Sequence, residues 1–105
     1  MFKVIGRETY LQEINKWPKS DKQIAEKIPA KLAENPFSGS PLGYKFLREK
    51  RVKEKRIYYL VYEDLNLVLL VATSGKKNQQ STIDHIKIHL EEFRKISENV
   101  SKQVS

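Results

Sequence analysis

The chain has 105 residues, of which 39% are hydrophobic and 31% charged, and its formal net charge is +7. These values predict one compact domain with a modest core beneath a polar surface. No apolar run approaches the roughly 20 residues that a membrane-spanning helix needs, so we expect no membrane partner. The absence of cysteine excludes disulfides and thiol chemistry and favours a cytoplasmic location.

The first part of the chain predicts a short strand followed by a helix. Residues 2–5 alternate weakly between apolar and polar side chains, as a strand does. Apolar residues recur at helical spacing over residues 10–17. Pro18 ends this helix, because the residue before a proline is pushed out of the α region.

A second helix follows, with Ser20 or Asp21 as its expected N-cap. Pro29 lies inside the run, where it removes a backbone N–H, so we expect a kink or two short helices that meet there. The expected buried face consists of Ile24, Ile28 and Leu32.

The middle of the chain predicts three consecutive strands. Residues 35–43 are dense in turn formers and form a loop. Strands are expected over residues 44–52, 56–62 and 67–73, with a turn at 63–66, which gives an antiparallel meander. The last of them is a continuous apolar run, which is typical of a central strand.

A final helix is expected to start at Ser81 or Thr82. Residues 1–97 then form one domain of order β-α-α-β-β-β-α, an α+β fold with an antiparallel sheet and helices packed on one face. Residues 98–105 are polar, and we expect them to be a disordered tail. The apolar stripe of the final helix consists of Ile83, Ile86, Leu90 and Phe93.

All the excess charge lies in two short segments. Residues 44–56 carry seven basic and two acidic side chains, a net charge of +5, and Lys76 with Lys77 adds the remaining +2. A clustered basic patch is typical of a nucleic-acid partner, although a solvated lysine-rich face is an equally good interpretation of charge alone. The seven basic residues are Lys45, Arg48, Lys50, Arg51, Lys53, Lys55 and Arg56.

Strand periodicity places the side chains of residues 56–62 on two faces. Arg56, Tyr58 and Tyr62 share one side, while Ile57 and Tyr59 share the other. One side packs on the helices, and the other is available to a ligand. Arginine and tyrosine on such a surface suit RNA, since both can stack on bases. The alternative is a sheet whose tyrosines fill the core.

Metal and cofactor motifs are absent from the sequence. It contains no P-loop, no Gly-x-Gly-x-x-Gly and no Gly-x-Ser-x-Gly. His85 and His89 lie four residues apart, but a zinc site needs three or four ligands. We therefore expect no metal, no cofactor and no small-molecule ligand.

Four segments together carry a family resemblance. Residues 34–42 (ENPFSGSPL), 47–52 (LREKRV), 55–59 (KRIYY) and 69–80 (LLVATSGKKNQQ) follow one another in order. Over residues 2–93 the chain resembles the RelE/ParE toxin superfamily, and the last segment is similar to its RelE/HigB-like branch of mRNA interferases. The resemblance implies a microbial-RNase-like fold.

The resemblance also implies an activity and a set of site residues. Ribosome-dependent members of the superfamily cleave mRNA without a metal: the 2′-hydroxyl of the RNA attacks the adjacent phosphate, and cationic side chains stabilise the developing charge. It implies an acidic antitoxin, the ribosome and mRNA as partners. The implied catalytic residues are Arg56, Lys77, Arg51 and Tyr59. The implied RNA-binding residues are Arg48, Lys50, Lys53, Lys55 and Lys76.

The chain departs from the family pattern at Ile83, near the position where many RelE-type enzymes have a catalytic tyrosine or histidine. A ParE-like toxin that poisons DNA gyrase without RNase chemistry is therefore an open alternative. An inactive member that binds RNA or an antitoxin is another. A general acid or base would have to come from Tyr58, Tyr59, Tyr62, Gln80, His85 or Lys76.

Overall fold

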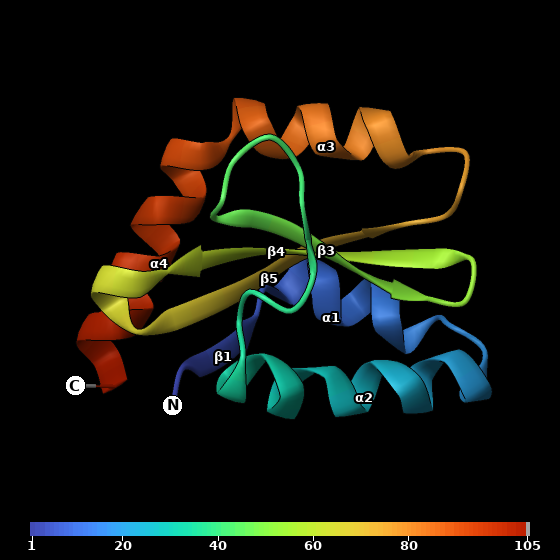
Figure 1. Cartoon of the computed structure of the whole chain (residues 1–105), viewed down its shortest axis with the longest axis horizontal. Helices are drawn as coiled ribbons and strands as arrows, with labels where there is room; N and C mark the ends of the chain where they lie inside the picture. The colour runs from blue at the N-terminus through green and yellow to red at the C-terminus, as the bar shows by residue number, and fades with distance from the viewer. Residues whose placement is uncertain (105) are drawn as a thin grey trace.

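Five strands form one mixed sheet in the order β1-β5-β4-β3-β2 (Figure 1). The computed structural model describes residues 1–104. The strands are β1 (Lys3–Gly6), β2 (Ser40–Pro41), β3 (Leu47–Val52), β4 (Lys55–Tyr62) and β5 (Leu67–Ser74). The helices are α1 (Glu8–Asn15), α2 (Lys19–Glu34), the short 3-10 helix η1 (Glu63–Leu65), α3 (Gln79–Ile88) and α4 (Leu90–Val104).

Strands β3, β4 and β5 form the predicted antiparallel meander, and β1 pairs in parallel with β5. The sheet order places β5, β4 and β3 in the interior, and of these β5 and β4 have apolar runs. Their apolar runs suit that position, because an interior strand covered on both faces buries every side chain.

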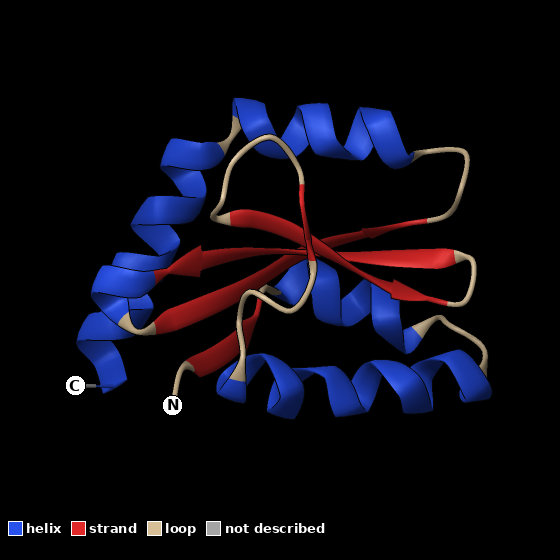
Figure 2. Cartoon of the chain, viewed as in Figure 1, coloured by secondary structure: helices blue, strands red, loops and turns tan. Residues whose placement is uncertain are grey.

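Helices cover both faces of the sheet, with α1 and α2 on one side and α3 and α4 on the other (Figure 2). The expectation that helices pack on one face is therefore wrong. The reason lies in β4 and β5: alternate residues of these strands point to opposite faces, and both sets are apolar or aromatic. Two layers of helices are needed to bury both sets.

The adjacent residues Tyr58 and Tyr59 show this two-sided burial. Tyr58 packs in the core beneath α3 and α4, and Tyr59 packs in the core against α1 and α2. Both are fully buried. The middle of β4 therefore offers no free face to a ligand, which contradicts the expectation that one side of the strand is available.

Helix α2 differs from its prediction in three respects. It begins after Pro18 without a side-chain cap, so neither Ser20 nor Asp21 caps it. It runs through Pro29 as one helix. Its buried residues are Asp21, Ala25, Ile28 and Leu32, while Ile24 is 39% exposed.

The predicted last helix is two helices, which meet at His89. Asn78, not Ser81 or Thr82, is the N-cap residue of α3. Residues 98–104 continue α4, and Val100 packs against the core, so the prediction of a disordered tail is wrong there. Ser105 lies outside the described residues. None of the described helices is long and apolar enough to cross a bilayer.

Candidate nucleic-acid interface

Two basic connections meet at one end of the sheet, on the right in Figure 1. One is the turn between β3 and β4, and the other is the loop between β5 and α3. The strand register brings them together, since Arg56 pairs with Arg51 on one side and with Ser74 on the other. Lys53 in the turn has a φ of 57°, a left-handed conformation that few residues other than glycine adopt.

A small pocket of about 150 Å³ lies where these connections meet. Four of its five lining side chains are cationic. We call it the cationic pocket, and its lining residues are Arg51, Lys53, Glu54, Arg56 and Lys76. Arg51 and Arg56 are direct cross-strand partners, an arrangement of like charges that is unfavourable without a counter-ion. The pocket is therefore suited to an anion such as a phosphate.

Arg56 is the most firmly held cation of this pocket, and its residue is only 6% exposed. One of its terminal nitrogens donates to the carbonyl of Glu54 at 3.2 Å and to that of Lys55 at 3.4 Å. Its Nε lies 3.9 Å from a carboxylate oxygen of Glu49. These contacts fix the guanidinium on the α3 side of the sheet, where little water screens its charge.

Tyr58 lies beneath Arg56 on the same face of β4, and its hydroxyl shares a hydrogen bond of 2.8 Å with Ser74 Oγ. Burial raises the pKa of Tyr58, and the nearby carboxylate of Glu49 adds to this effect. The phenol therefore stays protonated at neutral pH. It positions the end of β5 and is a poor candidate for a general base.

Lys53 and Lys55 share one partner on the opposite side of the sheet. The Nζ atoms of Lys53 and Lys55 lie 3.0 Å and 2.6 Å from the two oxygens of Asp21. Hydrogen bonds from Lys55 and then Lys53 lower the pKa of Asp21. Lys55 is thus held by α2, whereas Lys53 also lines the cationic pocket.

Arg48 does not reach the cationic pocket. Its three guanidinium nitrogens donate to the carbonyls of Gly39, Lys45 and Phe37 at 2.9 to 3.1 Å. All these contacts fix the loop before β3. The predicted RNA-binding role does not fit a side chain engaged in this way.

The predicted catalytic role of Tyr59 does not fit its position either. Its hydroxyl donates to the carbonyl of Pro36 at 2.8 Å and accepts from the N–H of Gly39 at 3.0 Å. It lies on the face of β4 opposite to Arg56. At Gly39, a Cβ would lie 2.5 Å from this hydroxyl and 2.4 Å from the carbonyl oxygen of Glu49. The residue must therefore be glycine for the loop to pack here.

Two further predicted residues lie next to the pocket without lining it. Lys77 is exposed in the loop, one residue after Lys76. Lys50 is half-buried and pairs with Ile57, so it points to the face opposite Arg51. Of the nine predicted site residues, the structure brings together Arg51, Lys53, Arg56 and Lys76.

Comparison with solved structures places this arrangement among known folds. An E. coli RelE toxin mutant in the free state has a TM-score of 0.69 at 14% identity, over 82% of this chain and 95% of that chain. The RelE–RelB complex from Pyrococcus horikoshii OT3 has a TM-score of 0.63 at 16% identity, over 71% and 94%. The chain has the RelE toxin fold.

The intact E. coli RelBE toxin–antitoxin complex contains the same RelE fold, with a TM-score of 0.63 at 15% identity, over 71% of this chain and 96% of that chain. No family model and no curated protein matches the sequence. These similarities establish the fold of the chain, and its activity depends on the residues of the site.

Within this RelE fold, the candidates for proton transfer lie apart from one another. Tyr62 is at the far end of β4, where Arg94 lies over its ring at 5.4 Å. Gln80 donates to Asp84, and His85 lines a different pocket. Of the six candidates that the sequence left open, Lys76 is the one that lines the cationic pocket.

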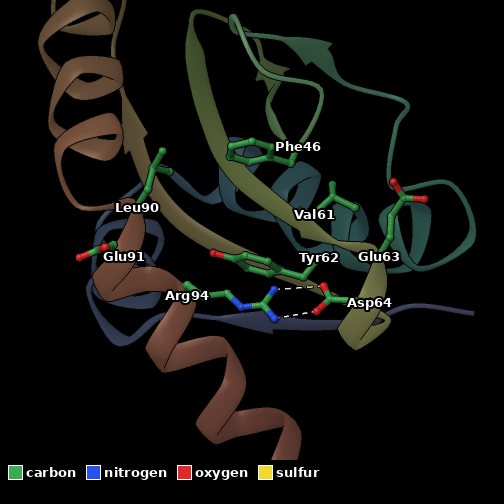
Figure 3. Close-up of a pocket in the computed structure, with 8 residues that line it drawn as sticks. All are labelled: Phe46, Val61, Tyr62, Glu63, Asp64, Leu90, Glu91 and Arg94. Atoms are coloured by element: carbon green, nitrogen blue, oxygen red, sulfur yellow. Dashed lines mark hydrogen bonds and ion pairs between the residues drawn. The ribbon is translucent and has the colours of Figure 1, made fainter.

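This chain also has a larger cavity, of about 570 Å³, at the opposite end of β4 (Figure 3). Phe46, Val61 and Leu90 give it an apolar lining. At its edge Arg94 and Asp64 form two hydrogen bonds of 3.0 and 2.6 Å. A polyanion would find no free cation there, because this arginine is already paired.

Proposed function

We propose that this chain is the toxin of a type II toxin–antitoxin system and that it cleaves mRNA on the ribosome without a metal. The observation that carries the proposal is the cationic pocket on a RelE fold, with Arg51 and Arg56 side by side and Lys76 beside them. Such a pocket is complementary to a phosphate whose negative charge increases during the reaction.

In the proposed reaction the 2′-oxygen of one nucleotide forms a bond to the adjacent phosphorus, and the bond from phosphorus to the 5′-oxygen breaks. Negative charge accumulates on the phosphorane oxygens. Arg56 is prepared for this charge, because backbone carbonyls already fix its guanidinium. Arg51 and Lys76 are exposed and can close on the phosphate from the solvent side.

The proton balance of this step needs a donor for the leaving 5′-oxygen and an acceptor for the 2′-hydroxyl proton. Lys76 is our candidate for the donor, since an ammonium group can supply a proton and this one lines the pocket. Water or the ribosome would take the proton from the 2′-hydroxyl. This arrangement predicts a slow enzyme compared with one that has a tyrosine or histidine at the site.

We propose an acidic antitoxin as the partner that covers the cationic pocket in the cytoplasm. Two observations support it: the structural neighbours include RelE toxins in complex with their antitoxins, and the basic residues cluster at one end of this chain. An acidic segment would add negative charge beside Arg51 and Arg56, where Glu49 lies 3.9 Å from Arg56. Toxicity would then depend on loss of the antitoxin.

A second candidate function is that of a ParE-like toxin, which poisons DNA gyrase without cleaving RNA. One observation favours it: Ile83 is half-buried against the core, so α3 presents an aliphatic side chain where a catalytic tyrosine or histidine was expected. A protein that only binds would need the cations of the pocket and no proton-transfer residue.

Induction of the chain in a host without the antitoxin tests both functions. Ribosome-dependent cleavage predicts growth arrest, a fall in protein synthesis, and new 5′ ends within translated mRNA. The same transcripts should stay intact when an antibiotic blocks initiation. Normal translation together with altered DNA supercoiling would instead establish the gyrase function, and neither effect would identify an inactive binder.

A further inference from the structure

A second polar pocket lies beside the cationic pocket and takes no part in the function proposed above. It has a volume of about 250 Å³ and is enclosed by the start of α1, the last part of β5 and the buried side of α3. Its lining includes Arg7, Glu13, Thr73, Thr82, His85 and Phe93. We call it the α1–α3 pocket.

The pocket exists because β1 is shorter than β5. Pairing between the two strands ends at Gly6 and Leu70, so the rest of β5 has no strand beside it on this edge among the described residues. Glu13 replaces the missing strand in part. One of its oxygens accepts from the backbone N–H of Thr73 at 3.1 Å and from the hydroxyl of Thr73 at 3.2 Å.

Two opposite charges face this pocket without neutralising each other. In the described part of the chain, neither Arg7 nor Glu13 forms an ion pair. The guanidinium carbon of Arg7 lies over the Phe93 ring, 5.1 Å from its centre, and among the described residues the guanidinium has no hydrogen-bond acceptor. The second carboxylate oxygen of Glu13 has no donor among the described residues. The pocket therefore presents a free donor group and a free acceptor group.

The presence of an unpaired guanidinium and an unpaired carboxylate in one pocket restricts the chemistry of a ligand. A phosphate would meet the carboxylate of Glu13, and a metal ion would meet the guanidinium of Arg7. An apolar ligand would leave both charged groups buried and unpaired, which is costly. A flat, neutral ligand with an acceptor next to an N–H donor satisfies both groups, and the Watson–Crick edge of a nucleobase has this pattern.

The position of the pocket indicates where such a base would come from. Thr73 lines the α1–α3 pocket and Lys76 lines the cationic pocket, three residues further along the same segment. Three residues of extended chain span about 10 Å at most. A ligand that reaches both pockets must carry a phosphate and a base. The exposed ring of His85 at the rim lies against the His89 ring, with ring centres 4.2 Å apart, and the two rings together offer aromatic surface for stacking.

We propose that the α1–α3 pocket binds a base of the RNA strand whose phosphate occupies the cationic pocket, with Arg7 donating to the base and Glu13 accepting from it. This inference rests on the proposed function, because it assigns base recognition to the same RNA strand. Arg7 and Glu13 are then specificity residues, and the reacting atoms lie at Arg56.

Binding of mononucleotides to the full chain tests the inference. The probes are GMP, AMP, CMP and UMP, with ribose 5-phosphate as the ligand without a base, and the readouts are calorimetry and the amide NMR signal of Thr73. At least one nucleotide should bind about five-fold or more tightly than ribose 5-phosphate, as expected for one stacked base. That nucleotide should also shift the Thr73 signal, since this N–H is bonded to Glu13.

The variant Glu13→Gln tests the role of the carboxylate while keeping an acceptor for Thr73. Its amide nitrogen would face the pocket as a donor in place of an acceptor. The nucleotide should therefore lose most of its tighter binding relative to ribose 5-phosphate. Binding of ribose 5-phosphate should not change. Glu92→Gln, an exposed position on α4 that does not line the pocket, is the matched control and should leave both ligands unaffected.

The outcomes separate this inference from the proposed function. If Arg56→Ala weakens the binding of ribose 5-phosphate and of the nucleotides by the same factor, the phosphate site stands. The base pocket is then judged by whether Glu13→Gln removes the tighter binding of the nucleotide. If a nucleotide binds more tightly than ribose 5-phosphate and Arg56→Ala changes neither affinity, the phosphate site is overturned and the base pocket stands. If the nucleotides and ribose 5-phosphate bind with equal affinity, or if none of them binds, the base pocket is overturned.

Discussion

The carboxylate of Asp21 holds the ammonium of Lys55 at 2.6 Å, which joins the first turn of α2 to the start of β4. The same carboxylate pairs with Lys53 at 3.0 Å. A single buried side chain thus fixes the β3–β4 turn against α2. That turn carries two of the five residues that line the cationic pocket, Lys53 and Glu54, so the contact positions the site from the opposite face of the sheet.

Asp21→Asn should lower the melting temperature, and the loss should depend on pH. Hydrogen bonds from Lys55 and Lys53 hold the pKa of Asp21 below its ordinary value of 3.8. A depressed carboxyl pKa gives stability that is fully present above the unfolded value and is lost as the pH falls through the folded value. The difference between parent and variant should therefore be constant near neutral pH and shrink below 3.8.

Thermal unfolding followed by circular dichroism over a pH series checks this prediction. Glu26→Gln, at an exposed position of the same helix, should show little difference at any pH. If the melting temperature of Asp21→Asn stays below that of the parent by the same amount in acid, packing and not the ion pairs stabilises the turn.

Arg56→Ala should reduce mRNA cleavage by about 100-fold to 1,000-fold, by analogy with removal of one transition-state donor. Arg56→Lys keeps the charge but not the planar fork, and we expect it to recover only part of the loss. Primer extension on a translated message measures the rate. Lys31→Ala, an exposed cation of α2, is the control. A folded Arg56→Ala protein with parental activity would remove this residue from the site.

Charge reversal tests whether position or total charge governs RNA binding. Arg51→Glu with Lys76→Glu should weaken binding and flatten its salt dependence by about 0.7 per lost contact in log affinity against log salt. Lys27→Glu with Lys95→Glu changes the net charge equally at exposed positions outside the cationic pocket. Equal losses from the two pairs would show that overall charge, and not a site, attracts the RNA.

Tyr59→Phe should destabilise the fold by about 1–3 kcal/mol, because it leaves the buried N–H of Gly39 and the carbonyl of Pro36 without a partner. The activity of the folded fraction should persist, since this hydroxyl faces away from Arg56. Urea unfolding gives the stability, and cleavage normalised to folded protein gives the activity. Loss of cleavage at unchanged stability would restore Tyr59 as a catalytic candidate.

The strands were predictable because their signal is local. Residues 56–62 and 67–73 are rich in β-branched, aromatic and leucine side chains, and both form strands close to the expected bounds. The two-sided cover was not predicted, because periodicity shows which residues share a face and does not show what covers it. The uninterrupted apolar character of residues 67–71 was the available signal for burial on both faces.

The site was predictable as a patch but not as a geometry. The clustered charge indicated Arg51, Arg56 and Lys76, which the fold brings together through strand register. The sequence alone could not indicate that Arg48 is bonded to a loop or that Lys55 is bonded to Asp21, 34 residues away. Those partners are fixed by tertiary contacts, and local patterns carry no information about them.

Because helices cover both faces of the sheet, the cationic pocket forms at one end of it, where Arg51 and Arg56 of the strands meet the β3–β4 turn and the β5–α3 loop. Exchange of the β5–α3 loop for that of another protein with the same fold should therefore change phosphate binding through Lys76, while base preference stays with Arg7 and Glu13. Phosphate affinity and base preference would then be separately adjustable in this protein.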